Sequence, residues 1–249
     1  PVTLGTTVTI DTTNFGVGSG ANINFNGGAS TVDATTAGVE GLTLTADTGA
    51  VTFDGDVGAG TALGAVSIDA TAGINLNAAN LITEDGQVDM LGPVTLGTSV
   101  AIDTTNLGAG TGATIDFIAT TVDATAAGVE ALTLTAGTGA VIFGGDVGSG
   151  TRLGALSIVS ADDVTANANI TAASFNQTDG TGTTDLNGAV DTDTAAGVTI
   201  TNETITVDNT ITTTGTGVVT LNADTMTLTF TAPGDIISDG AVSLTAAGG

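Results

Sequence analysis

The stretch GVEGLTLTADTGAVTFDGDVG, from Gly38 to Gly58, returns as GVEALTLTAGTGAVIFGGDVG, from Gly128 to Gly148, with differences only at positions 41, 47, 52 and 54 of the first copy. Runs such as LTLT (Leu42–Thr45) alternate apolar and small polar residues, which in a strand point to opposite faces. Turn signals such as Asp54-Gly55 follow these runs. The stretch therefore predicts β-strands, and its return predicts a stacked repeat architecture.

The repeat extends beyond this stretch in both directions. PVTLGTTVTIDTTNFG at Pro1 matches PVTLGTSVAIDTTNLG at Pro93, an offset of 93 − 1 = 92 residues. The opening stretch gives 128 − 38 = 90, because NFNGGASTVDAT at Asn24 is shortened by two residues to DFIATTVDAT at Asp116. We expect one continuous solenoid over residues 1–249, with a first repeat unit at 1–92, the closely similar part of a second at 93–160, and divergent coils of the same style at 161–249.

A shorter interval also recurs within the repeat. Equivalent runs begin 24 and 22 residues apart in one region and 21 and 23 apart in another, at Leu42, Val66 and Val88, and at Val198, Val219 and Val242. An interval of this size suits one coil of a parallel β-helix, in which three short strands and their corners make a turn. We therefore predict an all-β, right-handed parallel β-helix of about ten to twelve coils, with the longer repeat covering about four of them. An array of β-sandwich repeats is the alternative.

Composition restricts the function. The chain has 249 residues and a formal net charge of −25, with one basic residue against 26 acids and no His, Cys, Trp or Tyr. Most general bases, nucleophiles and soft metal ligands are missing, so we expect neither an enzyme nor a cofactor. A single basic residue also argues against a nucleic-acid partner. No run approaches the roughly 18 apolar residues of a membrane helix, so we expect no membrane insertion.

Carboxylates at glycine-rich turns are the candidates for a metal site. DGDVGAG at Asp54 places Asp54 and Asp56 in a turn that suits calcium. The second copy, GGDVGSG, keeps Asp146 but has Gly144 in place of Asp54, which removes a ligand. The sequence favours a solvated corner with no metal and leaves calcium at Asp54 and Asp56 open. DTDTAAG at Asp191 contains only a fragment of an EF-hand loop.

Three further features bear on whether the chain has a catalytic or binding role. Glycoside hydrolysis needs two acids at a defined separation, but Glu40 and Glu130 have no second nearby acid in the sequence. Arg152 is replaced by Ala62 in the other copy, which predicts a surface substitution. Thr-x-Thr pairs such as those at Thr43 and Thr133 do not recur once per coil, so strand propensity explains them better than ice binding. The sequence therefore predicts no catalytic residue.

The style of the later coils is similar to that of a known family. AGVTITNETITVDNTITTTGTGVVTLNA, from Ala196 to Ala223, and PGDIISDGAVSLTA, from Pro233 to Ala246, resemble the repeats of filamentous haemagglutinin-type proteins, giant β-solenoid surface proteins of bacteria. The resemblance implies an exported protein, extracellular or on the cell surface, that serves as an adhesin, biofilm component or surface filament. It transfers no catalytic residue to this chain.

Two functions follow from these observations. Both PVTLG at Pro1 and GAVSLTAAGG at the other end have the strand pattern and neither resembles a cap, so we expect the partner to be a second copy or neighbouring repeats. The first hypothesis is a structural rod that stacks end to end into a filament, sheath or matrix. The alternative is the stalk of a large secreted adhesin that binds host cells, glycans or surfaces. The change from Thr52 to Ile142, at an expected outward position, predicts a lateral contact between rods.

Overall fold

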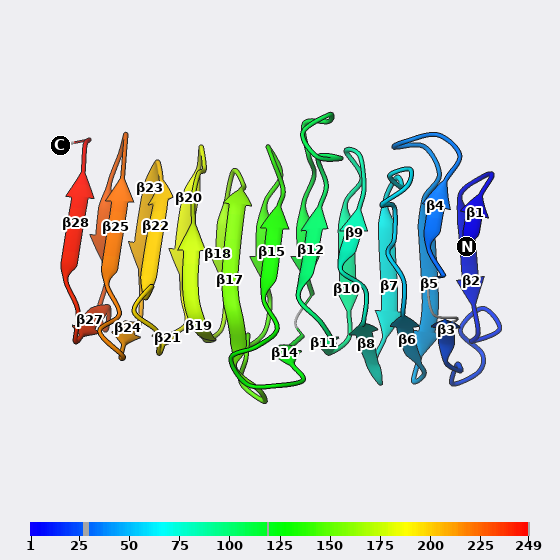
Figure 1. Cartoon of the computed structure of the whole chain (residues 1–249), viewed down its shortest axis with the longest axis horizontal. Coiled ribbons are helices and arrows are strands. Elements are labelled where there is room, and N and C mark those ends of the chain that lie inside the picture. Colours follow the sequence, from blue (N-terminus) through cyan, green and yellow to red (C-terminus); the bar gives the residue numbers. More distant parts are fainter. Residues whose placement is uncertain (27–29, 119, 249) are drawn as a thin grey trace.

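The computed structural model describes residues 1–26, 30–118 and 120–248, and these residues form strands and turns without any helix. Twenty-eight strands stack along the long axis of the molecule, from β1 (Val2–Leu4) at one end to β28 (Val242–Ala246) at the other (Figure 1). All pairs between these strands are parallel and lie about one coil apart in the sequence. The predicted β-solenoid is confirmed and the sandwich alternative is wrong, while the hand of the coil stays a prediction.

The chain crosses three faces in each coil, which we call A, B and C in the order in which it visits them. Face B is a single ten-stranded sheet made of β2 (Val8–Asp11), β5 (Leu42–Asp47), β7 (Val66–Ala70), β10 (Val88–Leu91), β13 (Ile115–Phe117), β16 (Val141–Phe143), β18 (Val164–Ala166), β20 (Thr183–Leu186), β23 (Thr204–Val207) and β26 (Leu228–Phe230). Because each coil contributes one strand, ten coils cross this face, at the lower end of the number that the sequence predicts.

Faces A and C are continuous through single-residue bridges. Face C consists of β3 (Ile23–Phe25), β6 (Ala50–Phe53), β8 (Gly73–Leu76), β11 (Val94–Leu96), β14 (Val122–Ala124), the bridge residue Val147, the first half of β19 (Ile170–Gln177), β21 (Val190–Thr192), β24 (Thr210–Thr213) and β27 (Asp235–Ser238). Face A consists of β1, β4 (Val32–Ala34), the bridge residue Val57, β9 (Asn80–Ile82), β12 (Val100–Asp103), β15 (Leu132–Thr135), β17 (Leu153–Ser160), the second half of β19, β22 (Val198–Asn202), β25 (Val219–Ala223) and β28.

The register confirms the short interval seen in the sequence. Leu42, Val66 and Val88 are in-register neighbours on face B, and Val198, Val219 and Val242 are neighbours on face A. Coil length nevertheless varies. The step from Val8 to Leu42 is 42 − 8 = 34 residues, because the first coil carries a loop between β2 and β3.

The duplicated sequence lies on a different face in each copy. β1 is on face A and its counterpart β11 on face C, whereas β5 is on face B and its counterpart β15 on face A. With the Val57 bridge counted as a strand position, β11 comes eleven positions after β1, which is three and two-thirds coils. The repeat is therefore one strand position short of four full coils, in line with the expected length of about four coils. The two copies can lie on different faces because all three faces bury alternate residues in the same way, so the alternation does not specify a face.

Apolar side chains fill most of the interior. Phe25 stacks on Phe53 on face C with ring centroids 4.9 Å apart, and their counterparts Phe117 and Phe143 stack on face B at 5.4 Å. These rings follow the strand register, so each pair buries a large apolar area between adjacent coils. The aromatic stack therefore lies on a different face in each copy of the duplicated sequence.

Glycine is required where a corner of one coil touches the next coil. Gly58 and its counterpart Gly148 have φ of 73° and 71°, in the left-handed region. A Cβ at Gly148 would lie 2.0 Å from the carbonyl oxygen of Thr171 in the following coil, and a Cβ at Gly58 equally close to that of Ile82. Only glycine fits this conformation and this approach.

We expect Gly148→Ala to lower the free energy of unfolding by more than about 1–2 kcal/mol, the cost of the left-handed conformation alone, because the methyl group also collides with the next coil. Gly5→Ala is the matched control, since no atom lies within 4 Å of a Cβ built there. Chemical denaturation of both variants at pH 7 measures the difference. Equal unfolding midpoints of the two variants would contradict the requirement for glycine at this corner.

Candidate functional site

Aspartates in strands β4 and β14 accept hydrogen bonds from backbone groups of the next coil. Asp33 Oδ1 accepts from the amide of Gly60 at 2.8 Å, and its counterpart Asp123 accepts from the amide of Gly150 at the same distance. Each bond joins residues 27 positions apart, which is about one coil. These carboxylates satisfy amide groups that the strand ladders leave free, so they hold adjacent coils together.

The turn at Asp54 and Asp56, where the sequence leaves calcium open, uses its carboxylates in the same way. Asp56 accepts from the backbone amide of Asn80 at 3.0 Å and from the Asn80 side chain at 3.2 Å, and Asp54 accepts from Asn77 Nδ2 at 2.8 Å. In the second copy Asp146 accepts from the amide of Asn169 at 2.9 Å. No cluster of three or more His, Cys, Asp or Glu residues suited to a metal ion occurs in the part of the chain that the structure describes.

Glu40 and Glu130 are nearly buried and close a turn of identical design. Thr35 Oγ1 donates to Glu40 Oε1 at 2.6 Å, while the Thr36 amide donates to Glu40 Oε2 at 2.9 Å. Glu130 accepts equivalent bonds from Thr125 Oγ1 at 2.9 Å and from the Ala126 amide at 2.8 Å. The two acids are thus turn-stabilising groups in separate coils, and they do not form a pair for glycoside hydrolysis.

These hydrogen bonds lower the pKa of both glutamates. The bond from the Thr35 hydroxyl is the main cause at Glu40, and the bond from the Ala126 amide is the main cause at Glu130. A hydrogen bond to the ionised carboxylate favours the charged form. The charged glutamates therefore stabilise the fold above the unfolded-state pKa of about 4.5, and this stabilisation is lost as the pH falls through the lowered folded-state pKa.

We expect Glu130→Gln to unfold at a lower denaturant concentration than the parent chain at pH 7, because its amide nitrogen cannot accept the bond from Ala126. The gap should narrow between pH 7 and about pH 3, because the parent glutamate becomes protonated as the pH falls below the unfolded-state pKa of about 4.5 and through its lowered folded-state pKa. Asp239→Asn, which removes one exposed carboxylate, is the control for the change in net charge. A gap that is constant between the two pH values would contradict the role of the charged carboxylate.

Arg152 has a larger role than the sequence predicts. Its guanidinium binds the Asp191 carboxylate at 2.7 Å and the Asp193 carboxylate at 3.3 Å, and it donates to the carbonyl oxygen of Ala172 at 2.7 Å. It thereby joins segments 20 and 39 residues away, so this partly exposed side chain also links neighbouring coils. The single positive charge of Arg152 partly offsets the two negative charges of DTDTAAG at Asp191.

The rows of outward-facing residues that run from coil to coil contain several residue types. Thr43 lies between Thr9 and Ser67, and Thr133 lies between Ala101 and Ser157. The structure thus places the two Thr-x-Thr pairs on different faces, with no run of threonines through both.

Ile142 points outward from face B, as the sequence predicts. Its in-register neighbours are Asp116 and Thr165, and Asp116 in turn lies beside Asp89. Burial raises the pKa of Asp116, and the nearby charge of Asp89 raises it further. The proposed lateral contact of Ile142 stays a prediction.

Two loops present apolar tips to solvent. Asp11 holds the first loop by accepting from the hydroxyl of Thr13 at 2.6 Å and from the amide of Phe15 at 3.0 Å, and Asp103 binds Thr105 and Leu107 in the same way. Phe15 is nevertheless 93% exposed, and Leu107 is 80% exposed. The second loop projects beyond its neighbours after β12 (Figure 1). The sequence signal for these tips was an apolar residue in DTTN-x-G in both copies, which our sequence analysis missed.

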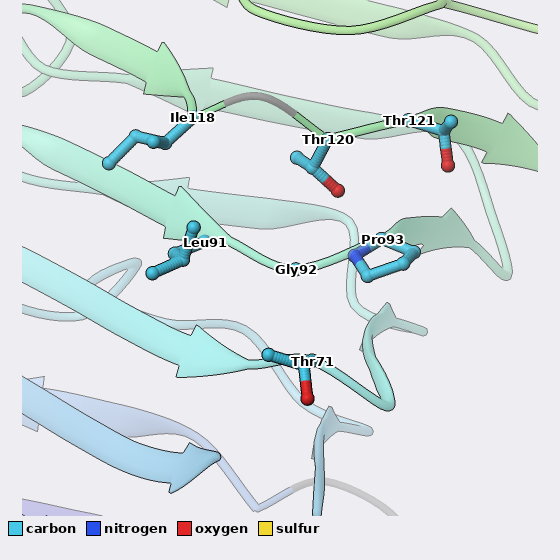
Figure 2. Close-up of a pocket in the computed structure, with 7 residues that line it drawn as sticks. All are labelled: Thr71, Leu91, Gly92, Pro93, Ile118, Thr120 and Thr121. Atoms are coloured by element: carbon cyan, nitrogen blue, oxygen red, sulfur yellow. The ribbon is translucent and has the colours of Figure 1, made fainter. Parts of the chain in front are cut away.

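A shallow groove lies at the corner between faces B and C. Leu91 and Ile118 form its apolar side, and Thr71, Thr120 and Thr121 line the rest, together with Gly92 and Pro93 (Figure 2). The Thr120 hydroxyl is buried and has no hydrogen-bond partner in the described residues. No charged side chain lines the groove, so it offers little to orient a ligand.

A polar layer interrupts the apolar interior in the coil that contains β20. Thr184 Oγ1 donates to Gln177 Oε1 at 2.7 Å and accepts from Asn202 Nδ2 at 2.9 Å, and all three side chains are fully buried. Buried Thr192 lies on face C of the same coil, so each of the three faces contributes an inward polar residue. Gln177 Nε2 and Thr192 Oγ1 have no hydrogen-bond partner among the described residues, so this layer is only partly satisfied and its two unpaired atoms cost stability.

The two end coils leave strand edges and apolar side chains open. At one end β1, β2 and β3 each pair with a single strand, and at the other end β26, β27 and β28 do the same. Val242 and Leu244 of β28 are both 48% exposed, whereas their neighbours Val219 and Leu221 in the preceding coil are fully buried. Phe230 and Ile236 line the same open hollow.

Comparison with models of known families, with curated proteins and with solved structures finds no match to this chain. No helix capable of crossing a membrane occurs in residues 1–26, 30–118 and 120–248. The candidate functional surfaces are therefore those that the structure itself presents: the two open ends and the two apolar loop tips.

Proposed function

We propose that the chain is a structural rod that assembles end to end into an extracellular filament, sheath or matrix on a bacterial surface. The open, apolar end coils carry the proposal. Six strands, three at each end, have one free edge each, and free parallel edges pair readily with further strands. The bacterial and extracellular part of the proposal rests on the resemblance of residues 196–223 and 233–246 to haemagglutinin-type repeats.

The internal repeat measures how much a preceding coil would bury at the first end. Val2 is 40% exposed, whereas its counterpart Val94, which packs against β8, is 1% exposed. The two residues stand in nearly identical sequence, so the difference comes from the coil that precedes Val94. A second copy stacked on this end would bury Val2 and its neighbours in the same manner.

Contacts between unlike ends do not close on themselves. The last coil of one copy meets the first coil of the next, so the same contact is available again after every addition and produces an open filament. A net charge of −25 opposes association between the sides of the rods, and salt screens this repulsion. Growth along the axis is therefore favoured over lateral clustering.

We expect the purified chain to form unbranched filaments at physiological salt, visible by negative-stain electron microscopy, and Leu244→Glu to abolish them, because the new charge would be buried in the end contact. Ser243→Glu is the matched control. It adds the same charge on the neighbouring outward position of β28, and filaments should persist. A parent chain that remains monomeric in sedimentation at high concentration would contradict end-to-end assembly.

A second candidate, the stalk of a secreted adhesin, is favoured by the exposed loop tips. Coils of the same longer chain would then cover the open ends, and Phe15 and Leu107 would contact cells, glycans or another surface. Rigid loops that hold an apolar residue in solvent are typical of binding sites.

If the stalk hypothesis holds, beads coated with the chain should adhere to cells or immobilised glycans, and Phe15→Ser with Leu107→Ser should reduce that adhesion severalfold. Val129→Ser, which changes an exposed apolar residue outside these loops, is the control. Equal adhesion of all three proteins and of uncoated beads would contradict this candidate.

A further inference from the structure

We propose that the tip of the Leu107 loop of one copy docks into the groove between faces B and C of a second copy, so that rods associate side by side. The inference goes beyond end-to-end assembly, because it concerns the sides of the rod and does not depend on either end coil. Both surfaces leave apolar side chains in solvent: Leu107 is 80% exposed, and Leu91 and Ile118 of the groove are 40% and 36% exposed.

The Leu107 loop is held in one conformation by its own coil and by the preceding coil. Asp103 accepts from the Leu107 amide at 3.0 Å. From the preceding coil, Asp85 accepts from the amide of Thr111 at 2.7 Å and from the amide of Gly112 at 2.9 Å. The tip is therefore preformed, and it loses little conformational freedom when it binds.

The backbone of the tip is strained. Asn106 and Leu107 have φ of 50° and 57°, in the left-handed region that bulky residues rarely adopt. Asn14 and Phe15 repeat this conformation in the first loop, at 55° and 58°, although that loop lies at a different corner of the rod. A strained conformation that is kept at two corners indicates a role for the exposed side chain. Because that side chain is Phe in one copy and Leu in the other, the role requires an apolar group and no aromatic ring.

The groove has the shape and the lining to take up such a side chain. It crosses three successive coils, from Thr71 after β7, past Leu91 and Gly92 after β10, to Ile118 after β13 (Figure 2). Gly92 leaves the middle of the groove without a side chain, and a Cβ there would lie 2.0 Å from the carbonyl oxygen of Ala70. The volume of the groove is about 320 Å³, more than a leucine side chain needs. The groove has few groups to orient a ligand, but a rigid loop brings its own orientation.

The tip and the groove lie at the two ends of one strand, β13. The Leu107 loop leads from face A into β13, and Ile118 follows the last residue of that strand. In Figure 1 the loop projects at the upper edge of the rod, whereas the connections from face B to face C, next to the labels β8, β11 and β14, lie along the lower edge. A second copy in the same orientation, displaced sideways along β13, therefore brings its groove to the tip of the first copy. The two surfaces differ, so the contact is available again on every added copy and produces a sheet of parallel rods.

Charge favours a second copy as the occupant of the groove. Each chain has a net charge of −25, so two rods approach most easily where no carboxylates meet. No charged side chain lines the groove, and Asp69, the in-register neighbour of Leu91, is half-buried. The exposed residues 107–109 of the tip are uncharged as well. A basic partner would bind the acidic remainder of the surface, whereas an uncharged groove suits another acidic rod once salt screens the rest.

Disulfide formation between two single-cysteine variants tests the contact, because the chain contains no cysteine. Leu107→Cys is mixed with Leu91→Cys, and a mass tag on one of them identifies heterodimers on non-reducing gels. Val39→Cys mixed with the same Leu91→Cys is the matched control. Val39 is an exposed apolar residue at the same edge of the rod as Leu107, three coils away. We expect heterodimers to form severalfold faster in the Leu107 mixture, and equal rates in the two mixtures would overturn the inference.

Negative-stain electron microscopy of the parent chain, Leu107→Glu and Val39→Glu gives the second readout. We expect side-by-side rods from the parent chain and from Val39→Glu, and only separate rods or filaments from Leu107→Glu, because its charge would be buried in the groove. Side-by-side rods that persist in Leu107→Glu would overturn the inference. A parent chain that forms separate filaments alone would overturn it and leave end-to-end assembly intact. Side-by-side rods without filaments would support it and overturn the proposed function.

Discussion

A strand in this molecule can satisfy its backbone groups only through the strands one coil before it and one coil after it, and every other feature depends on that requirement. No helix or second layer covers a free edge in the residues that the structure describes, so each coil must follow the previous one closely at its corners as well as along its strands. Gly148 permits the close approach at a corner where any Cβ would collide with the next coil. Asp33 and Asp123 supply acceptors where the ladder leaves amides free. The same requirement leaves the backbone groups on the outer edges of the two end coils without partners.

The sequence predicted the fold well because the alternating apolar pattern of one coil recurs in the following coils. The spacing of Leu42, Val66 and Val88 reports the coil directly, and the structure pairs those residues in register. What could not be predicted is the face on which a segment lies. Alternation is identical on the three faces, and a loop that lengthens one coil leaves no trace in the pattern of the next. The counterparts β5 and β15 therefore occupy different faces despite nearly identical sequence.

The acidic residues were harder to interpret. Asp54 and Asp56 have the residue type and spacing of a metal-binding turn, but their partners Asn77 and Asn80 lie a full coil later in the sequence. Arg152 illustrates the same difficulty, since the acids that it binds are two coils away. Such partners are found only when the coil length is known residue by residue. In a chain with one basic residue and 26 acids, several carboxylates, among them Asp33, Asp85 and Asp163, hold adjacent coils together through neutral donors.

The central claim is that one spiral of strand positions continues through the chain and from copy to copy. Helical reconstruction of the filaments by cryo-electron microscopy measures this most directly. The account predicts continuous strand density across each junction, with the same spacing of about 4.8 Å between coils as inside a chain. A filament whose strand density is broken at each junction would contradict the account.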